Sequence, residues 1–459
     1  MPGRGLVGPL VALAVVLGGI GAIVAWFMSA EGYLPGDAML RSWEAAEDRK
    51  VEVGAGDDNW VVGDVAVRSR YDAVTGFGLT EGHEGKKLWE YVPAGRSEIC
   101  GTAEHAGKGA VLVLQRGDGS DVAGRSGTGC TTVLALNAED GRELWREEQK
   151  PPRDEDGKEV DVSAPTLDAR GDLAVVAQDR RGTEYDAQGR PVKKDGKRGD
   201  AVLRGLDLRT GKPRWIAELP DRCGPESVSV GKKRVFVVLS CGAGGRDRRE
   251  VSELTVARFD RATGSLEWHV PIDARRPLDP ATRVSIESTD PLVLAVGESD
   301  ENEEVTGLFV SFDENGRPRP AIDFSRGDDG LIDANSLMQT AVVGDRLYAL
   351  AGYWSKGNHH TVIAFDLKTG EEVWAEEMGD PAAAMTASGD KVTVLCEWST
   401  QSEAITTLIE LDAGDGDETD ERHFRDPVPS PVSAIYEHDG LLVTAGRGGG
   451  APFIGYERW

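Results

Sequence analysis

The feature of this sequence that most constrains its fold is a repeat that ends in tryptophan. Each copy is a short hydrophobic run, an Asp or Asn, a polar turn that contains Gly, and then a Trp; clear copies are VARFDRATGSLEW at residues 256–268 and VIAFDLKTGEEVW at residues 362–374. Repetition of this kind predicts one structural unit per copy, each stacked on its neighbours. The tryptophans that end the copies are Trp89, Trp145, Trp215, Trp268 and Trp374.

Each copy has the pattern of two strands joined by a hairpin. A short apolar run that ends at a turn signal is typical of a buried strand, and the residues after the Gly indicate its hairpin partner. In residues 362–374, Asp366 can accept hydrogen bonds from the turn, and Gly370 can adopt the positive φ that the turn needs. Two further strands with a short turn lie between copies, as in residues 340–352. Four strands per unit is the blade of a β-propeller.

The repeat resembles that of the pyrroloquinoline-quinone-like β-propeller family, whose blade motif is close to A-x-D-x-x-T-G-x-x-x-W. Residues 206–215, 259–268 and 365–374 match this motif best. The resemblance implies an all-β fold, and counting the units gives an eight-bladed β-propeller of four-stranded antiparallel blades, with seven blades as the alternative. Residues 431–459 supply only three strands, so residues 39–43 are expected to add the fourth and to close the ring with strands from both termini.

An apolar segment precedes the repeats. Residues 6–27 carry no charged side chain and, at about 1.5 Å of rise per residue, can cross a bilayer core of roughly 30 Å as one helix. Arg4 precedes this segment and Glu31 follows it, so the positive-inside rule places the propeller outside the cell membrane. We expect a single-pass protein, with secretion after cleavage as the alternative. Its parts are a cytoplasmic tail (1–5), a transmembrane anchor (6–27), a tether (28–37) and the propeller (38–459).

The five cysteines fit an oxidising compartment. Cys223 begins the first predicted strand of one blade and Cys241 ends the second strand, so antiparallel pairing would bring them together as a disulfide. Cys100 and Cys130 begin the first and third strands of an earlier blade, where a second disulfide is predicted. Cys396 has no partner by position, and we expect it to be a buried free thiol.

The predicted loops differ between the two rims of the propeller. Loops between second and third strands are long in several blades, whereas the hairpins on the opposite rim are short. We call these the long-loop rim and the short-hairpin rim. Binding residues usually lie on long loops held by a rigid scaffold, so the long-loop rim is the expected functional face, and the short-hairpin rim is expected to face the membrane.

Two groups of side chains on the long-loop rim are candidates for binding. An aromatic group is suited to peptide or sugar contact, with packing over the rim as its alternative. A basic group could contact an anionic polymer or an acidic peptide, with a solvated loop as its alternative. The candidates are Tyr353, Trp354, Trp398 and His359 in the aromatic group, and Arg180, Arg181, Lys193, Lys194, Arg248 and Arg249 in the basic group.

The net charge and the absence of several catalytic motifs reduce the range of possible functions. A net charge of −27 predicts that the chain as a whole repels nucleic acid. Enzymes of the resembled family typically have a vicinal cysteine pair, a calcium site and a catalytic Asp, and this sequence has no adjacent cysteines and no matching constellation. No HExxH, GxSxG or GxxxxGK[ST] motif occurs.

We therefore predict no catalytic residue, no cofactor and no metal. The expected function is that of a monomeric, membrane-anchored, non-enzymatic binding or assembly scaffold for protein or envelope polymer. The alternatives are a pyrroloquinoline-quinone-dependent oxidoreductase and an extracytoplasmic ligand sensor.

Overall fold

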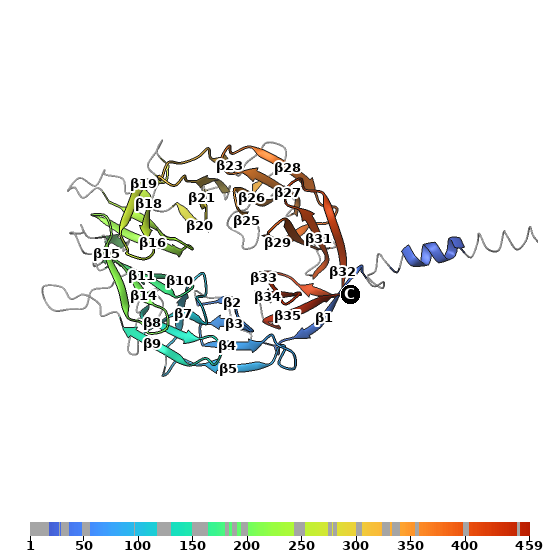
Figure 1. The fold of residues 1–459 in the computed structure, drawn as a ribbon, viewed down its shortest axis with the longest axis horizontal. Coiled ribbons are helices and arrows are strands. Elements are labelled where there is room, and N and C mark those ends of the chain that lie inside the picture. The colour runs from blue at the N-terminus through green and yellow to red at the C-terminus, as the bar shows by residue number, and fades with distance from the viewer. Residues whose placement is uncertain are drawn as a thin grey trace, which may run out of the picture.

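The computed structural model describes residues 18–26, 28 and most of residues 36–459. The gaps within the second region are residues 48–55, 96, 117–129, 149–163, 180–182, 186–190, 194–200, 243–252, 274–277, 279–281, 300–304, 324–330, 333–339, 354–357, 398–403 and 448–449. The described strands form sheets that follow one another around a common centre, as in a β-propeller (Figure 1), and all but one of the strand pairings are antiparallel.

The first three sheets each contain four strands, and each sheet runs from the centre of the ring to its outside. The first contains β2 (Asp58–Val62), β3 (Val65–Arg70), β4 (Ala73–Gly78) and β5 (Lys87–Tyr91). The second contains β6 (Ile99–Thr102), β7 (Ala110–Arg116), β8 (Cys130–Asn137) and β9 (Glu143–Glu148). The third contains β10 (Thr166–Arg170), β11 (Leu173–Asp179), β14 (Ala201–Asp207) and β15 (Pro213–Glu218), and the strands β12 (Thr183–Tyr185) and β13 (Pro191–Lys193) pair separately.

The next three sheets repeat this order. The fourth contains β16 (Cys223–Val230), β17 (Arg234–Cys241), β18 (Glu253–Asp260) and β19 (Leu266–Pro271). The fifth contains β20 (Arg283–Thr289), β21 (Leu292–Ser299), β22 (Val305–Ser311) and β23 (Ile322–Asp323). In the sixth, β26 (Arg346–Tyr353), β27 (Asn358–Asp366) and β28 (Glu372–Glu377) follow β24 (Leu331–Ile332) and β25 (Thr340–Val343), which both pair with β26.

The remaining strands form one eight-stranded sheet in which both ends of the propeller meet. Its strands, in spatial order, are β29 (Ala382–Ser388), β30 (Lys391–Glu397), β31 (Ala404–Asp412), β32 (Glu418–Pro429), β1 (Ala38–Glu44), β35 (Phe453–Arg458), β34 (Leu441–Gly446) and β33 (Val432–His438). β1 pairs antiparallel with β35 from Met39 opposite Arg458 to Glu44 opposite Ile454. The N-terminal strand thus completes a sheet whose other three strands come from the C-terminal end.

The repeat tryptophans join neighbouring sheets. Each indole nitrogen donates a hydrogen bond to a main-chain carbonyl in the hairpin between the third and fourth strands of the next sheet. The pairs are Trp89–Ala138 (3.0 Å), Trp145–Leu208 (2.7 Å), Trp215–Arg261 (2.9 Å), Trp268–Glu314 (3.3 Å) and Trp374–Ala413 (3.2 Å). These rings and the apolar strand faces form core clusters that each bridge two sheets.

Trp43 in β1 takes the same place where the ring closes, which the repeat pattern did not reveal. Its ring lies against Gly455 of β35 and against Gly85 of the first sheet, where a Cβ atom would collide with the indole. Gly85 also has a positive φ of 67°, which favours glycine. Trp43 is therefore buried between the last strands of the chain and the first sheet.

The apolar segment before the propeller is only partly described. Residues 18–26 form a helix, and its side chains Ile20, Ile23, Val24 and Trp26 are exposed. Within the described part of the chain, no helix has the length and apolarity needed to cross a membrane. Residues 1–17, 27 and 29–35, which hold the predicted tail and most of the predicted anchor and tether, lie outside the described residues.

Candidate functional site

The two predicted disulfides are present and lie at the long-loop rim. Cys223 and Cys241 stand directly opposite each other in the pairing of β16 with β17, with their Cα atoms 4.0 Å apart. Cys100 in β6 and Cys130 in β8 are bonded across the second sheet, with a Cα separation of 6.1 Å. Cys396 is free and buried, as predicted, and burial raises the pKa of its thiol to about 12.

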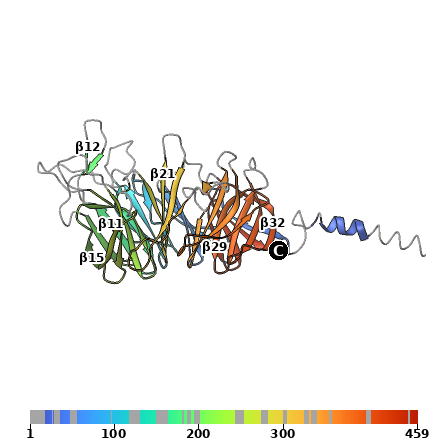
Figure 2. The same ribbon diagram turned by 90° about the horizontal axis from the view of Figure 1, so that it is seen from above.

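Each disulfide fixes a strand end from which a long connection leaves the sheet. Cys130 is the first strand residue after the connection between β7 and β8, and Cys241 is the last one before the connection between β17 and β18. On the same rim, β12 and β13 pair with each other within the connection from β11 to β14, and Figure 2 shows β12 above the ends of the sheets. The bases of these connections are thereby held at fixed positions on a rigid sheet.

Three of the predicted binding residues fall on described strands. Tyr353 ends β26 and His359 lies near the start of β27, so both are at the end of this strand pair that belongs to the long-loop rim. Lys193 ends β13 and pairs with Thr183. The other predicted binding residues lie outside the described residues: Trp354, Trp398, Arg180, Arg181, Lys194, Arg248 and Arg249.

A group of ionisable side chains on the innermost strands and in the turn between β6 and β7 was not predicted. We call Asp58, Glu104, His105, Asp168 and Glu287 the channel cluster. Asp168 in β10 is fully buried and accepts hydrogen bonds from the main-chain nitrogens of His105 (2.9 Å) and Val230 (2.6 Å). Its carboxylate also lies 3.3 Å from Nδ1 of His105. Asp168 therefore links β10 to the turn between β6 and β7 of the second sheet and to β16 of the fourth sheet.

The outer members of the channel cluster make similar contacts between sheets. The carboxylate of Asp58 in β2 accepts a hydrogen bond of 3.1 Å from the hydroxyl of Thr102 in β6. The carboxylate of Glu287 in β20 accepts one of 2.6 Å from the hydroxyl of Thr340 in β25. Polar contacts of this kind hold inner strands of adjacent sheets together, since each buried polar group needs a partner.

Three members of the channel cluster, Asp58, Glu104 and His105, have raised pKa values. Burial raises the pKa of Asp58 to about 6, against the smaller opposing effect of its hydrogen bonds. Enclosure by the protein raises the pKa of Glu104 to about 7, although the side chain keeps contact with solvent, and the charges of Asp168 and Glu287 add to this effect. Burial works to lower the pKa of His105, but the hydrogen bond and charge of Asp168 outweigh it and raise that pKa.

This arrangement can bind and release protons near neutral pH. A cavity of about 340 Å³ adjoins it and is lined by His105, Arg170, Ser229, Lys232 and Glu287, among others. Perturbed acids and a histidine beside a cavity are common in functional sites and in structural networks alike. The sequence signal was the presence of acids such as Asp168 within otherwise apolar inner strands, but their mutual proximity comes from the ring.

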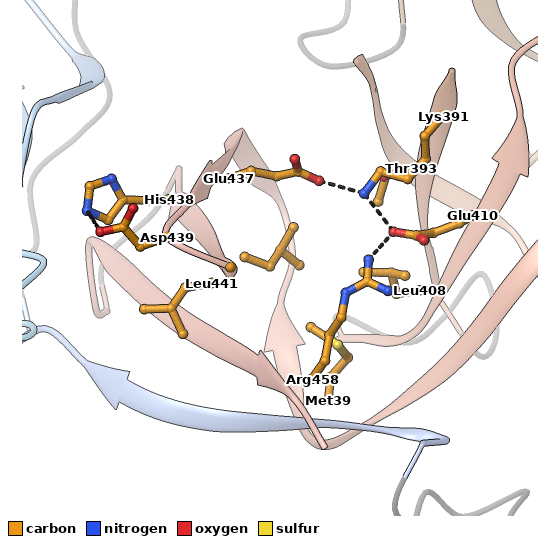
Figure 3. Close-up of a pocket in the computed structure, with 12 residues that line it drawn as sticks. Met39, Lys391, Thr393, Leu408, Glu410, Glu437, His438, Asp439, Leu441 and Arg458 are labelled. Atoms are coloured by element: carbon orange, nitrogen blue, oxygen red, sulfur yellow. Dashed lines mark hydrogen bonds and ion pairs between the residues drawn. The ribbon is translucent and has the colours of Figure 1, made fainter. Parts of the chain in front are cut away.

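A second cavity lies in the eight-stranded sheet, where its two halves meet (Figure 3). It measures about 530 Å³. Lys391 lies between Glu410 (2.9 Å) and Glu437 (2.7 Å), and Arg458 of β35 pairs with Glu410 and with Asp420 (2.8 Å). Although burial acts to raise the pKa of Glu410, its bonds to Arg458 and Lys391 lower it. The charges of this network are mutually satisfied, so it serves to hold the closing strands.

Comparisons with known proteins agree with this architecture. The family model of outer membrane protein assembly factor BamB matches residues 42–221 and 252–447. No curated protein matches the chain.

Among solved structures, Sqt1 of Saccharomyces cerevisiae is similar with a TM-score of 0.50 at 9% identity, covering 93% of this chain and 99% of that one. Quinohemoprotein alcohol dehydrogenase ADHIIG of Pseudomonas putida is similar with a TM-score of 0.50 at 13% identity, covering 92% and 77%. BamB of Moraxella catarrhalis has a TM-score of 0.45 at 14% identity, covering 90% and 99%. At these identities the two structures with a TM-score of 0.50 show the fold alone.

Proposed function

This chain belongs to the family of the outer membrane protein assembly factor BamB, and we propose that it is a non-enzymatic scaffold that binds or assembles protein through its long-loop rim. The observation that carries the proposal is the position of the two disulfides, because both fix the bases of long connections on that rim. A rigid ring that presents loops at one face is suited to partner capture. The family description, which names an assembly factor, supports protein as the partner, and envelope polymer is the other candidate.

We also propose that the ring has eight blades. Six sheets of four or five described strands are separate, and the eight-stranded sheet divides between β32 and β1. There the pairing is parallel and spans only Ala38 opposite His423 and Met39 opposite Phe424, whereas the pairings within each half are antiparallel. Two four-stranded blades joined at their outermost strands account for this sheet.

The apolar segment 6–27 supports a membrane anchor with the propeller outside. Its length and lack of charge fit a single span, and the disulfides fit an oxidising compartment. Deletion of residues 6–27 is expected to release the protein from a carbonate-washed membrane fraction. Release of the full-length chain by the same wash would contradict the anchor.

The fold family also implies a quinone cofactor with three carboxylates. The charges of the channel cluster do not suit such a group. Asp58, Glu104, Asp168 and Glu287 face the same region, and mutual repulsion contributes to the raised pKa of Glu104. A trianionic ligand would add negative charge to this cluster, and only Arg170, Lys232 and His105 of the adjoining cavity could offset it. This mismatch supports the scaffold over the oxidoreductase.

The choice between scaffold and oxidoreductase can be tested by titrating the exported, disulfide-bonded chain with pyrroloquinoline quinone, with and without Ca²⁺. If the chain is a scaffold, we expect no heat of binding and no shift of the quinone absorption band. Stoichiometric binding with a shifted band would overturn the scaffold proposal in favour of the oxidoreductase. Circular dichroism of the same sample, with the signal of a folded β protein, ensures that an absence of binding is not due to unfolding.

A further inference from the structure

Two short hairpins from opposite ends of the propeller chain meet on the short-hairpin rim. Asp64 lies in the turn between β2 and β3, and His438 and Asp439 lie at the turn between β33 and β34. The two strand pairs are held together by a hydrogen bond of 2.7 Å from the Tyr436 hydroxyl to the carbonyl of Asn59. The three side chains therefore stand at the seam between the last sheet and the first.

The potential metal-ligand atoms of Asp64, His438 and Asp439 lie close together. Nε2 of His438 lies 3.5 Å from a carboxylate oxygen of Asp64 and 3.8 Å from one of Asp439, and all three atoms are within 4.8 Å of one another. Figure 3 shows the imidazole of His438 and the carboxylate of Asp439 facing each other at one side of the large cavity. Nε2 itself is buried and has no hydrogen-bond partner among the described residues.

Neither contact counts as a hydrogen bond, because Nε2 has no hydrogen-bond partner among the described residues, and most nitrogen–oxygen hydrogen bonds span about 2.7–3.2 Å. The two separations are close to the separation of two ligands of one metal ion. With bonds of about 2.0–2.2 Å to zinc, ligand atoms of a tetrahedral site lie roughly 3.3–3.6 Å apart. The distances from Nε2 of His438 to the two carboxylates are within a few tenths of an ångström of this range, and the carboxylates of Asp64 and Asp439 lie within 4.8 Å of each other.

We propose that Asp64, His438 and Asp439 form a binding site for a divalent transition-metal ion of the Zn²⁺ class. Two carboxylates and a neutral imidazole supply two negative charges, which balance a divalent cation. The imidazole favours zinc and similar ions over Ca²⁺ and Mg²⁺, which prefer oxygen ligands. Three protein ligands leave a fourth position for water, because both carboxylates are largely exposed.

The position of the site gives the ion a structural role. Asp64 belongs to the first sheet, and His438 and Asp439 belong to the strands that complete the last one. An ion bound there would bridge the seam where the ring closes. Because the unfolded chain does not hold these residues together, binding stabilises the folded ring in proportion to the logarithm of ion concentration.

Calorimetric titration of the metal-stripped full-length chain with Zn²⁺ tests the site, together with thermal unfolding at increasing Zn²⁺. One ion is expected to bind at the seam and raise the melting temperature. His438→Gln and Asp64→Asn are each expected to weaken that binding by about tenfold or more. Asp390→Asn is the matched control, because this exposed carboxylate occupies the corresponding β29–β30 turn, and it should leave binding unchanged.

Three outcomes would overturn the proposal: no Zn²⁺ binding by the folded chain, unchanged binding in both ligand variants, or equal loss in the control. If His438→Gln fails to fold, Asp439→Asn replaces it, since this side chain is 89% exposed and its loss leaves the core intact. The scaffold function does not depend on this result, because the site lies on the opposite rim.

Discussion

The indole nitrogen of Trp215 in β15 donates a hydrogen bond of 2.9 Å to the main-chain carbonyl of Arg261, which lies in the hairpin between β18 and β19 of the next sheet. Gly264 of the same hairpin has a φ of 72°, and a Cβ atom there would collide with the ring of Trp215. One tryptophan thus fills the space that a glycine leaves open in its neighbour. The same relationship joins Trp374 to Gly416.

Replacement of Trp215 should weaken the contact between the third and fourth sheets. Trp215→Ala removes a buried ring and its hydrogen bond, with an expected loss of about 3–5 kcal/mol in the free energy of unfolding. Urea unfolding followed by circular dichroism measures this loss. Ile216→Ala on the same strand is the control, because its side chain is 64% exposed, and it should change stability by less than about 0.5 kcal/mol. Similar losses in both variants would contradict a stabilising contact between Trp215 and the fourth sheet.

The channel cluster should make stability fall as the pH rises. The pKa of Asp58 is about 6 in the folded chain, above its ordinary 3.8, so the folded state binds more protons than the unfolded state between these values. The free energy of unfolding therefore decreases from about pH 4 to about pH 6. Asp58→Asn should remove part of this decrease and should be more stable than the parent at pH 7 by about 1–2 kcal/mol.

Thermal unfolding between pH 4 and pH 8 measures the effect of Asp58→Asn. The exposed Glu139→Gln serves as control and should follow the parent curve. A variant that is less stable than the parent at pH 7 would mean that Asp58 is charged and stabilising in the folded chain.

The Cys223–Cys241 disulfide should stabilise the chain by restricting its unfolded state. Replacing both cysteines by serine is expected to cost about 2–4 kcal/mol. A reducing agent breaks both disulfides, so the reduced parent should have the unfolding midpoint of a variant in which Cys100 and Cys130 are also replaced by serine. A parent whose midpoint does not change on reduction would contradict a stabilising role for either bridge.

Cys396 should be unreactive in the folded chain. Its thiol is fully buried, and burial raises its pKa to about 12, so almost no reactive thiolate is present at neutral pH. Mass spectrometry after treatment with iodoacetamide should show no modification under native conditions and one modified cysteine after unfolding without reductant. Rapid modification of the native chain would show that Cys396 is accessible.

Much of the fold could be predicted because its signals are local. The turn that contains Asp366 and Gly370, and the Trp374 that follows it, lie within one short stretch of sequence, so the pattern can be recognised directly. The disulfide between Cys223 and Cys241 was predictable because antiparallel register places the ends of β16 and β17 opposite each other.

The remaining features depend on the closed ring, which no local pattern encodes. Asp58, Asp168 and Glu287 lie in three different sheets, on the strands β2, β10 and β20 that surround the common centre (Figure 1). Trp43 lacks the turn that precedes the other repeat tryptophans, so its role became visible only through its contact with Gly455. Asp64 and His438 are near opposite ends of the propeller chain and meet because β1 closes the last sheet.

Site-specific photo-crosslinking in the native cell envelope tests directly whether the long-loop rim binds a protein partner. Asp221 and Thr210 are both exposed and flank β15, but Asp221 lies beside the Cys223–Cys241 bridge on the long-loop rim and Thr210 lies in a hairpin of the opposite rim. We expect a discrete protein adduct from a photoreactive residue at position 221, loss of that adduct when both cysteines are replaced, and no adduct from position 210. Adducts from 210 alone, or equally from both positions, would contradict this expectation.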